Sequence, residues 1–180
     1  MDDVITRLSA EARALAEESE VARQRMLVLA RGRQECILGL HASGLSVRGI
    51  AERLGSSASV IQDAIRTAKG RHPQARREER FPFELHVMLG MRLRENPSRL
   101  RGLARENLER MRRTPRAAVA ERWLDRWEEL LRLPDDELEK AMLADDEEGR
   151  DLRQISPFAG ALSPEDRLVA MKKAQLLAKG

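Results

Sequence analysis

Polar and basic side chains recur between residues 57 and 71 at a spacing that a helix would place on one face. Gln62 and Arg66 lie four residues apart, and each can make two hydrogen bonds in one plane. A glutamine pairs in this way with an adenine edge and an arginine with a guanine edge, whereas serine hydroxyls contact phosphate more often. The candidate nucleic-acid contacts are Ser57, Ala58, Ser59, Gln62, Asp63, Arg66, Lys69 and Arg71.

Two charged members of this set need separate explanations. A phosphate backbone would repel the Asp63 carboxylate, so Asp63 either accepts from a cytosine amino group or pairs with Arg66 or Arg48. Arg71 belongs to the basic stretch RHPQARREER, which is either a solvated linker or a source of phosphate contacts. We expect a phosphate contact for Arg71, and give the same role less weight for Arg76 and Arg77.

The sequence offers no constellation for catalysis, for a metal or for a cofactor. The three histidines are scattered and lack a second His or Cys at metal-ligand spacing. Cys36 is expected to be a small core residue of a helix, and GLSVRG lacks the spacing and the preceding strand of a phosphate loop. The acidic pairs Asp135-Asp136 and Asp145-Asp146 are expected at exposed helix starts and turns. We therefore predict no enzymatic activity and no cofactor.

The stretch from Gly44 to Gly70 is predicted to form two short helices joined by a tight turn. Gly55 ends the first helix, because a residue without Cβ adopts positive φ at little steric cost. Ser56 or Ser57 can then cap the second helix. The expected apolar stripes are Leu45, Ile50, Ala51 and Leu54 on the first helix, and Val60, Ile61, Ala64 and Ile65 on the second.

This pattern resembles the helix-turn-helix regulators of bacteria and their phages. The resemblance covers residues 33–70 and departs from the family at Ser56, where an apolar residue often follows the glycine. It implies that the start of the second helix enters the major groove of double-stranded DNA. The alternatives are a purely structural hairpin, or recognition of RNA or protein. A looser likeness, in the run LRQISPFAGALSPEDR from Leu152 to Arg167, is to tails of small bacterial helix-turn-helix proteins, some of them encoded beside toxin genes.

Charge is unevenly distributed along the chain. The formal net charge is only +3, yet residues 21–80 carry twelve basic and five acidic residues. Residues 135–151 carry two basic and nine acidic residues. The most basic segment thus contains the candidate contacts, which favours a nucleic-acid partner. The acidic block is interpreted either as a charged surface loop or as a docking face for basic groups.

Composition predicts an all-α chain. Of 180 residues, 42% are hydrophobic and 35% charged, and no segment shows the alternation of a strand. A single cysteine excludes an intrachain disulfide, which fits a cytoplasmic location. No apolar run approaches the length of a membrane span, and the first residues do not resemble a signal peptide.

Residues 3–43 are predicted to form a long helix, with Gly32 as a candidate kink. Steps of three and four along it define a weak seam, made of Ile5, Leu8, Ala12, Leu15, Ser19, Ala22, Met26 and Leu29. This seam either pairs two copies of the chain as a homodimer or packs against the C-terminal half. Beyond it, Ile37, Leu38 and Leu40 would belong to the first helix of the DNA-binding unit, which ends at Gly44.

Residues 83–180 are predicted to form a bundle of about five helices. The breaks fall at Asn96-Pro97, Thr114-Pro115, Pro134 and Ser163-Pro164, the first, second and last being cap-and-proline pairs. The expected core stripes include Val119, Trp123, Trp127 and Leu130, and in the last helix Leu168, Met171, Ala174 and Leu177. This bundle would mediate oligomerisation or bind a protein partner.

The sequence thus predicts an N-terminal helix over 1–32, a helix-turn-helix over 33–72, a basic linker over 73–82 and an interaction module over 83–180. The expected function is sequence-specific binding of double-stranded DNA by a transcriptional regulator, most simply a repressor that occludes a promoter. The alternative is an antitoxin-like protein that sequesters a partner through residues 83–180.

Overall fold

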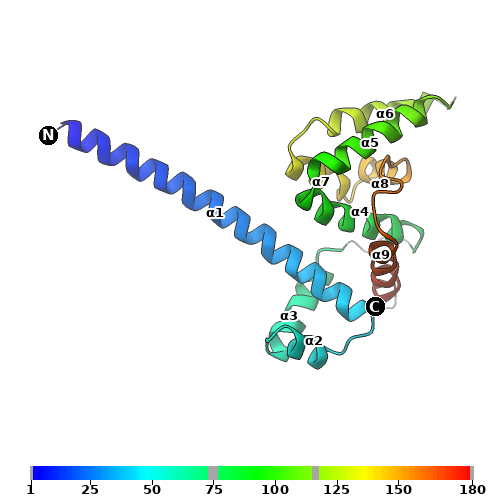
Figure 1. The fold of residues 1–180 in the computed structure, drawn as a ribbon, viewed down its shortest axis with the longest axis horizontal. Helices are drawn as coiled ribbons and strands as arrows, with labels where there is room; N and C mark the ends of the chain where they lie inside the picture. Colours follow the sequence, from blue (N-terminus) through cyan, green and yellow to red (C-terminus); the bar gives the residue numbers. More distant parts are fainter. Residues whose placement is uncertain (1, 73–76, 115–117, 179–180) are drawn as a thin grey trace.

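The computed structural model describes residues 2–72, 77–114 and 118–178, which form α-helices joined by turns, with no strand among them (Figure 1). The chain is therefore all-α, as predicted. Its helices are α1 (Asp2–Ala42), α2 (Val47–Arg53), α3 (Ala58–Lys69), α4 (Arg77–Glu95), α5 (Pro97–Arg112), α6 (Ala118–Leu130), α7 (Asp135–Met142), α8 (Glu147–Gln154) and α9 (Pro164–Leu177). Within this described part, no helix combines the length and the apolar character needed to cross a bilayer.

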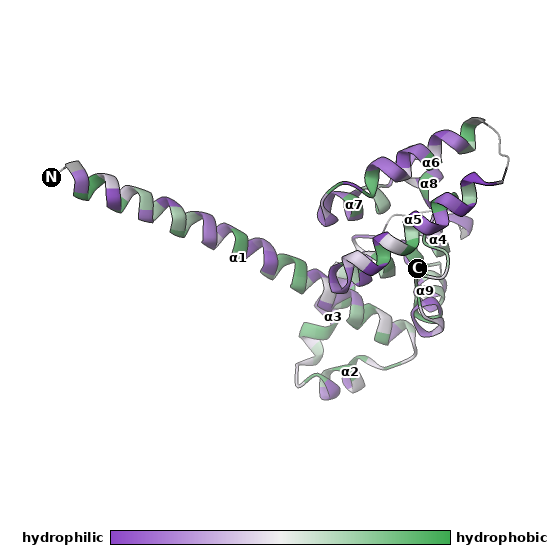
Figure 2. Ribbon diagram, turned by 45° about the horizontal axis from the view of Figure 1, so that its top comes forward, coloured by the Kyte–Doolittle hydropathy of each residue, from purple (hydrophilic) through white to green (hydrophobic). Residues whose placement is uncertain are grey.

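Helix α1 is continuous for 41 residues, and most of it projects away from the rest of the molecule (Figure 1). The helix passes through Gly32 without a break. Every side chain from residue 3 to residue 30 is exposed, including the whole predicted seam. Hydrophobic and hydrophilic residues intermix along this part of α1 (Figure 2). Packing of the seam against the C-terminal half of the same chain is therefore excluded.

The C-terminal end of α1 packs with α2 and α3 around one hydrophobic cluster. Its buried members are Ile37, Leu38, Ile50, Ala51, Ile61, Ala64, Ile65 and Ala68. Two residues predicted for the stripes lie elsewhere: Leu54 is 43% exposed and Val60 is 45% exposed. Leu54 follows the last residue of α2, and Val60 lies in the first turn of α3, so both positions are beyond the contact between the two helices.

Helices α4 to α8 contribute to a second hydrophobic cluster, and its largest fully buried side chain is Trp127. As predicted, Trp127 and Leu130 are fully buried and Trp123 packs against this cluster, while Val119 is 54% exposed near the start of α6. Asn96 caps α5 with Pro97 at its first position, as the sequence indicated. The predicted pair at Thr114-Pro115 falls partly on residues outside the described ranges.

Two boundaries differ from the sequence prediction. Helix α4 begins at Arg77, before Phe83 where we expected it, and carries Pro82 inside it. The acidic segment around Asp146 was expected to be a turn, yet Asp146 caps an additional helix, α8, by accepting from the Gly149 amide at 2.7 Å. Acidic residues in the first turn of α8 are favourable beside its unpaired amides.

Helix α9 leaves the second cluster and packs between α4 and α1. Its buried residues are Ala170, Lys173 and Ala174, whereas Leu168 is 45% and Met171 40% exposed. The predicted stripe of α9 is thus wrong at Leu168 and Met171 and right at Ala174, while Leu177 is half-buried. The reason is that α9 turns toward charged partners on α1 and α4, so a lysine occupies the centre of its buried face.

Candidate nucleic-acid interface

Serine caps fix the starts of α2 and α3, and one glycine lies in the connection between these two helices. Ser46 accepts from the Gly49 amide at 3.1 Å, and Ser57 accepts from the Val60 amide at 3.3 Å. Gly55 has φ +57°, which confirms the positive φ expected there. The Ser56 amide then donates to the Ala51 carbonyl at 2.9 Å, closing the end of α2. These contacts hold α3 against α2 and the end of α1.

The outer side of α3 is polar and open to solvent. Its inner side carries the buried apolar residues of the first cluster, so the remaining positions face outward. All eight predicted contact residues are exposed, and seven of them belong to α3 or its cap: Ser57, Ala58, Ser59, Gln62, Asp63, Arg66 and Lys69. We call these seven residues the outer face of α3.

Asp63 already has a partner on this outer face. Arg66 donates to the Asp63 carboxylate at 2.6 Å, with side-chain exposures of 79% for Arg66 and 61% for Asp63. This is one of the two pairings considered for Asp63. The Ser57 and Ser59 hydroxyls lie 3.0 Å apart at the start of the helix. The pairing turns the guanidinium toward Asp63, so a nucleotide must compete for it or use its remaining donors.

Arg71 is separate from the outer face of α3. Its guanidinium donates to Gln34 at 2.6 Å and to Glu35 at 3.1 Å, both on α1. The side chain remains 32% exposed, so some of its donors stay accessible. Of the two weaker candidates, Arg76 lies outside the described residues and Arg77 begins α4.

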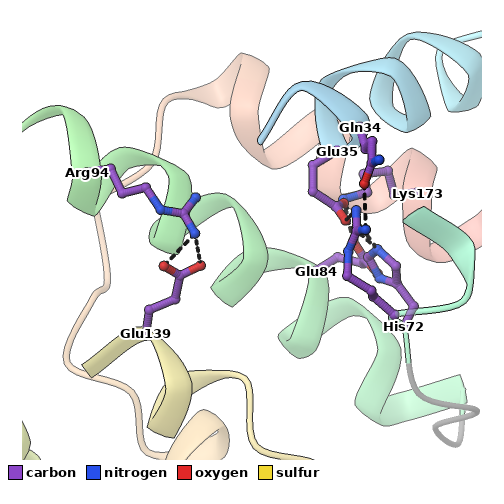
Figure 3. A network of polar contacts seen from close by, with 8 residues as sticks. Gln34, Glu35, His72, Glu84, Arg94, Glu139 and Lys173 are labelled. Carbon is purple, nitrogen blue, oxygen red and sulfur yellow. Dashed lines mark hydrogen bonds and ion pairs between the residues drawn. The ribbon is translucent and has the colours of Figure 1, made fainter. Parts of the chain in front are cut away.

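A buried cluster of charged groups, which we call the junction, joins α1, α4 and α9 to the segment after α3 (Figure 3). His72 lies between two carboxylates, 2.6 Å from Glu84 and 3.1 Å from Glu35. The Lys173 ammonium lies 2.7 Å from Glu35 and 3.0 Å from Glu84. Sequence reasoning missed the junction, because Glu35 and Lys173 are 138 residues apart and neither stands in a recognisable motif.

The charges of the junction stabilise one another. Burial raises the pKa of Glu35, but the hydrogen bond to His72 and the charge of Lys173 together outweigh it and lower this pKa to about 2. Burial lowers the pKa of His72, yet its hydrogen bonds to Glu35 and Glu84 raise it above the ordinary value. Both shifts favour the charged forms. The junction therefore fixes the end of α3 relative to α4 and α9, because His72 and Lys173 each lie against both carboxylates.

Other chemistry-bearing residues do not assemble into a site. Cys36 is exposed, which corrects the expected core position: Ile37 and Leu38 face the hydrophobic cluster, and Cys36 is turned away from it. His86 is buried between the Pro82 carbonyl and the Ser156 hydroxyl, and burial lowers its pKa to about 4. In the described ranges, no group of three or more His, Cys, Asp or Glu is arranged to hold a metal ion.

The acidic block 135–151 lies mostly on α7, α8 and the connection between them. Several of its carboxylates pair with arginines of the same chain: Asp135 with Arg101, Glu139 with Arg94 and Glu148 with Arg126. These arginines compensate part of the negative charge to which a basic partner would bind. Asp146 and Glu147 remain exposed.

Comparison of the chain with protein-family models, with curated proteins and with solved structures gave no match.

Proposed function

We propose that α2, the turn at Gly55 and α3 act as a helix-turn-helix that binds double-stranded DNA sequence-specifically. The observation that carries the proposal is the division of α3 into a buried apolar side and an exposed polar side. A helix that presents Gln62 and Arg66 at one face offers the two side chains best suited to bidentate base contacts. By this proposal the protein is a transcriptional regulator of the bacterial or phage type, and most simply a repressor.

Electrostatics supports the same partner. Arg48 and Arg53 on α2 and Lys69 on α3 are exposed, and none of them has an ion-pair partner within the described residues. Cations of this kind neutralise phosphates and release counterions, which supplies affinity without selectivity. Selectivity then rests on Gln62 and Arg66, with Asp63 holding the Arg66 guanidinium in place until a base edge replaces it.

The proposed regulator is a homodimer paired through α1. The seam is fully exposed, and Ile5, Leu8 and Leu15 are each more than half exposed. Alanine and serine at three seam positions make the contact shallow. We therefore expect a dissociation constant in the micromolar range, which corresponds to a binding free energy of about 8 kcal/mol. Sedimentation should find a monomer when residues 1–30 are deleted. A truncated protein that still dimerises would place the contact in the C-terminal half.

Selection from a random pool of short DNA duplexes tests the function. The proposal predicts enrichment of one motif, arranged as an inverted repeat if the dimer binds. Single-stranded RNA of the same length should not compete at equal concentration. Failure to enrich any motif, or stronger retention of RNA than of duplex DNA, would reject sequence-specific DNA binding.

A further inference from the structure

A cavity of about 670 Å³ lies between α1, α4 and α7, beside the junction. Its apolar wall is formed by side chains from these helices and the residue after α7: Val28, Phe83, Val87, Met91 and Leu143. Charged groups lie around the same space, with the Arg94–Glu139 pair and the junction on two sides of it (Figure 3). A volume of a few hundred Å³ with an apolar wall and few charged groups is typical of small-molecule sites.

The charge around this cavity is not balanced. Glu139 accepts from Arg94 at 2.6 Å, and Glu35 is held by Lys173 at 2.7 Å, so both carboxylates are neutralised. Arg31 and Lys140 line the cavity, and neither has an ion-pair partner among the residues that the structure describes. In the whole lining, four arginine and lysine side chains face three carboxylates: Arg31, Arg71, Arg94 and Lys140 against Glu35, Asp136 and Glu139. The charge of Arg31 also acts on Glu139, where it opposes the rise in pKa that burial causes. The cavity thus combines an apolar wall with surplus positive charge.

We propose that this cavity binds a small amphipathic anion, a molecule with an apolar body and one carboxylate or phosphate head. The body would lie against Phe83, Val87 and Met91, and the head would be held by Arg31. The apolar wall supplies affinity in proportion to the area it covers, and the charge selects anions over neutral or cationic molecules of the same length. This proposal does not depend on DNA binding.

Gly32 offers a way to close the cavity without damaging the fold. It lines the cavity, and a Cβ built on it would meet no atom within 4 Å. Gly32→Leu therefore adds an apolar side chain in free space on a helix that leucine favours. Gly102 in α5 is the matched control, because a Cβ there also meets no atom within 4 Å and Gly102 does not line the cavity.

The probes are decanoate, decyl phosphate, decanol and decyltrimethylammonium, each titrated into the full chain by calorimetry. We expect saturable binding of one molecule of decanoate or decyl phosphate per chain, at least tenfold tighter than decanol, and no binding of the cation. The difference between decanoate and decyl phosphate identifies the preferred head. Arg31→Gln should weaken both anions about tenfold, whereas Arg33→Gln, an exposed neighbour outside the cavity, should not.

Gly32→Leu should abolish binding and Gly102→Leu should leave it unchanged, with equal helix content by circular dichroism in both variants. The proposal is overturned if no probe binds, if decanol binds as tightly as decanoate, or if Gly32→Leu binds like the parent. The last result would assign the binding to another apolar surface, such as the exposed seam of α1.

Discussion

The junction and the outer face of α3 both contain ion pairs, but in opposite environments. At the junction, Lys173 is 0% and Glu84 2% exposed, and each charge is held by opposite charges of the same chain. On the outer face, Arg66 is 79% exposed and pairs with a single aspartate. A buried ion pair contributes to the stability of the fold, because removing one partner leaves the other as an uncompensated buried charge. An exposed ion pair adds little to stability, so its side chains can give up their mutual contact and bind a ligand instead.

The sharpest test of this contrast is Lys173→Met, which removes the buried cation and leaves Glu35 and Glu84 close together. We expect the free energy of unfolding to fall by about 3–5 kcal/mol, measured by urea denaturation. Lys172→Met is the control, because its side chain lies on the same helix and has no described partner at the junction. A Lys173→Met protein as stable as the control would show that the junction does not hold the helices together.

The turn at Gly55 should be the next most sensitive position. Gly55→Val places a β-branched residue at φ +57°, so unfolding should become easier by more than about 1 kcal/mol. Gly55→Asn should lose less, because asparagine tolerates this region better. Thermal melts of the two variants decide the point. If both melt with the parent, the conformation assigned to this turn is wrong.

The junction should also make stability depend on pH. His72 has a raised pKa in the folded state, so its contribution is complete below the unfolded value of 6.5 and is lost as pH rises through the folded pKa. Glu35 has a lowered pKa, so its contribution is complete above 4.5 and is lost as pH falls toward about 2. Together they predict the largest stabilisation between pH 4.5 and 6.5.

His72→Gln should remove the alkaline part of this dependence. The quantity to plot is the difference in unfolding free energy between parent and variant from pH 5 to pH 9, whose slope for one proton reaches at most about 1.4 kcal/mol per pH unit. Taking a difference cancels His86, which carries a pKa lowered to about 4 in both proteins and destabilises them as pH falls. A difference that stays constant with pH contradicts the assignment to His72.

The smallest effect is expected on the outer face of α3. Arg66→Ala breaks an exposed pair, so it should change the free energy of unfolding by no more than about 1 kcal/mol. Urea denaturation of Arg66→Ala and the parent measures this difference in the free energy of unfolding. A loss comparable to that of Lys173→Met would mean that the two regions do not differ as described.

Local signals in the sequence predicted the local structure well. Gly55 and Ser57 set the turn before α3, and Asn96-Pro97 and Ser163-Pro164 set helix starts, because each signal acts within one helical turn. The exposure of the candidate contacts also followed from the helical period. In contrast, the buried face of α9 could not be predicted, since Lys173 is buried only because Glu35 and Glu84 arrive from distant parts of the chain.

Arg71, at the candidate site, is a second case in which contacts with a distant segment could not be predicted from the sequence. Sequence position placed it beside the outer face of α3, but contacts with Gln34 and Glu35 turn it toward α1. The spacing of apolar residues in α1 likewise predicted a seam, but it left open where the seam packs. The structure excluded packing within the chain, because residues 3–30 are exposed. Contacts between distant segments decide such questions, and no short pattern encodes them.

The central claim is that the outer face of α3 reads DNA bases, and one binding measurement tests it directly. Parent, Gln62→Ala and Lys69→Ala are titrated with the selected duplex and with a random duplex at several salt concentrations. The account predicts that Gln62→Ala loses about 1–3 kcal/mol on the selected duplex only. Lys69→Ala should weaken both duplexes alike and reduce the salt slope by about one, because Lys69 is exposed and has no described ion-pair partner. Equal losses on both duplexes for Gln62→Ala would contradict the claim.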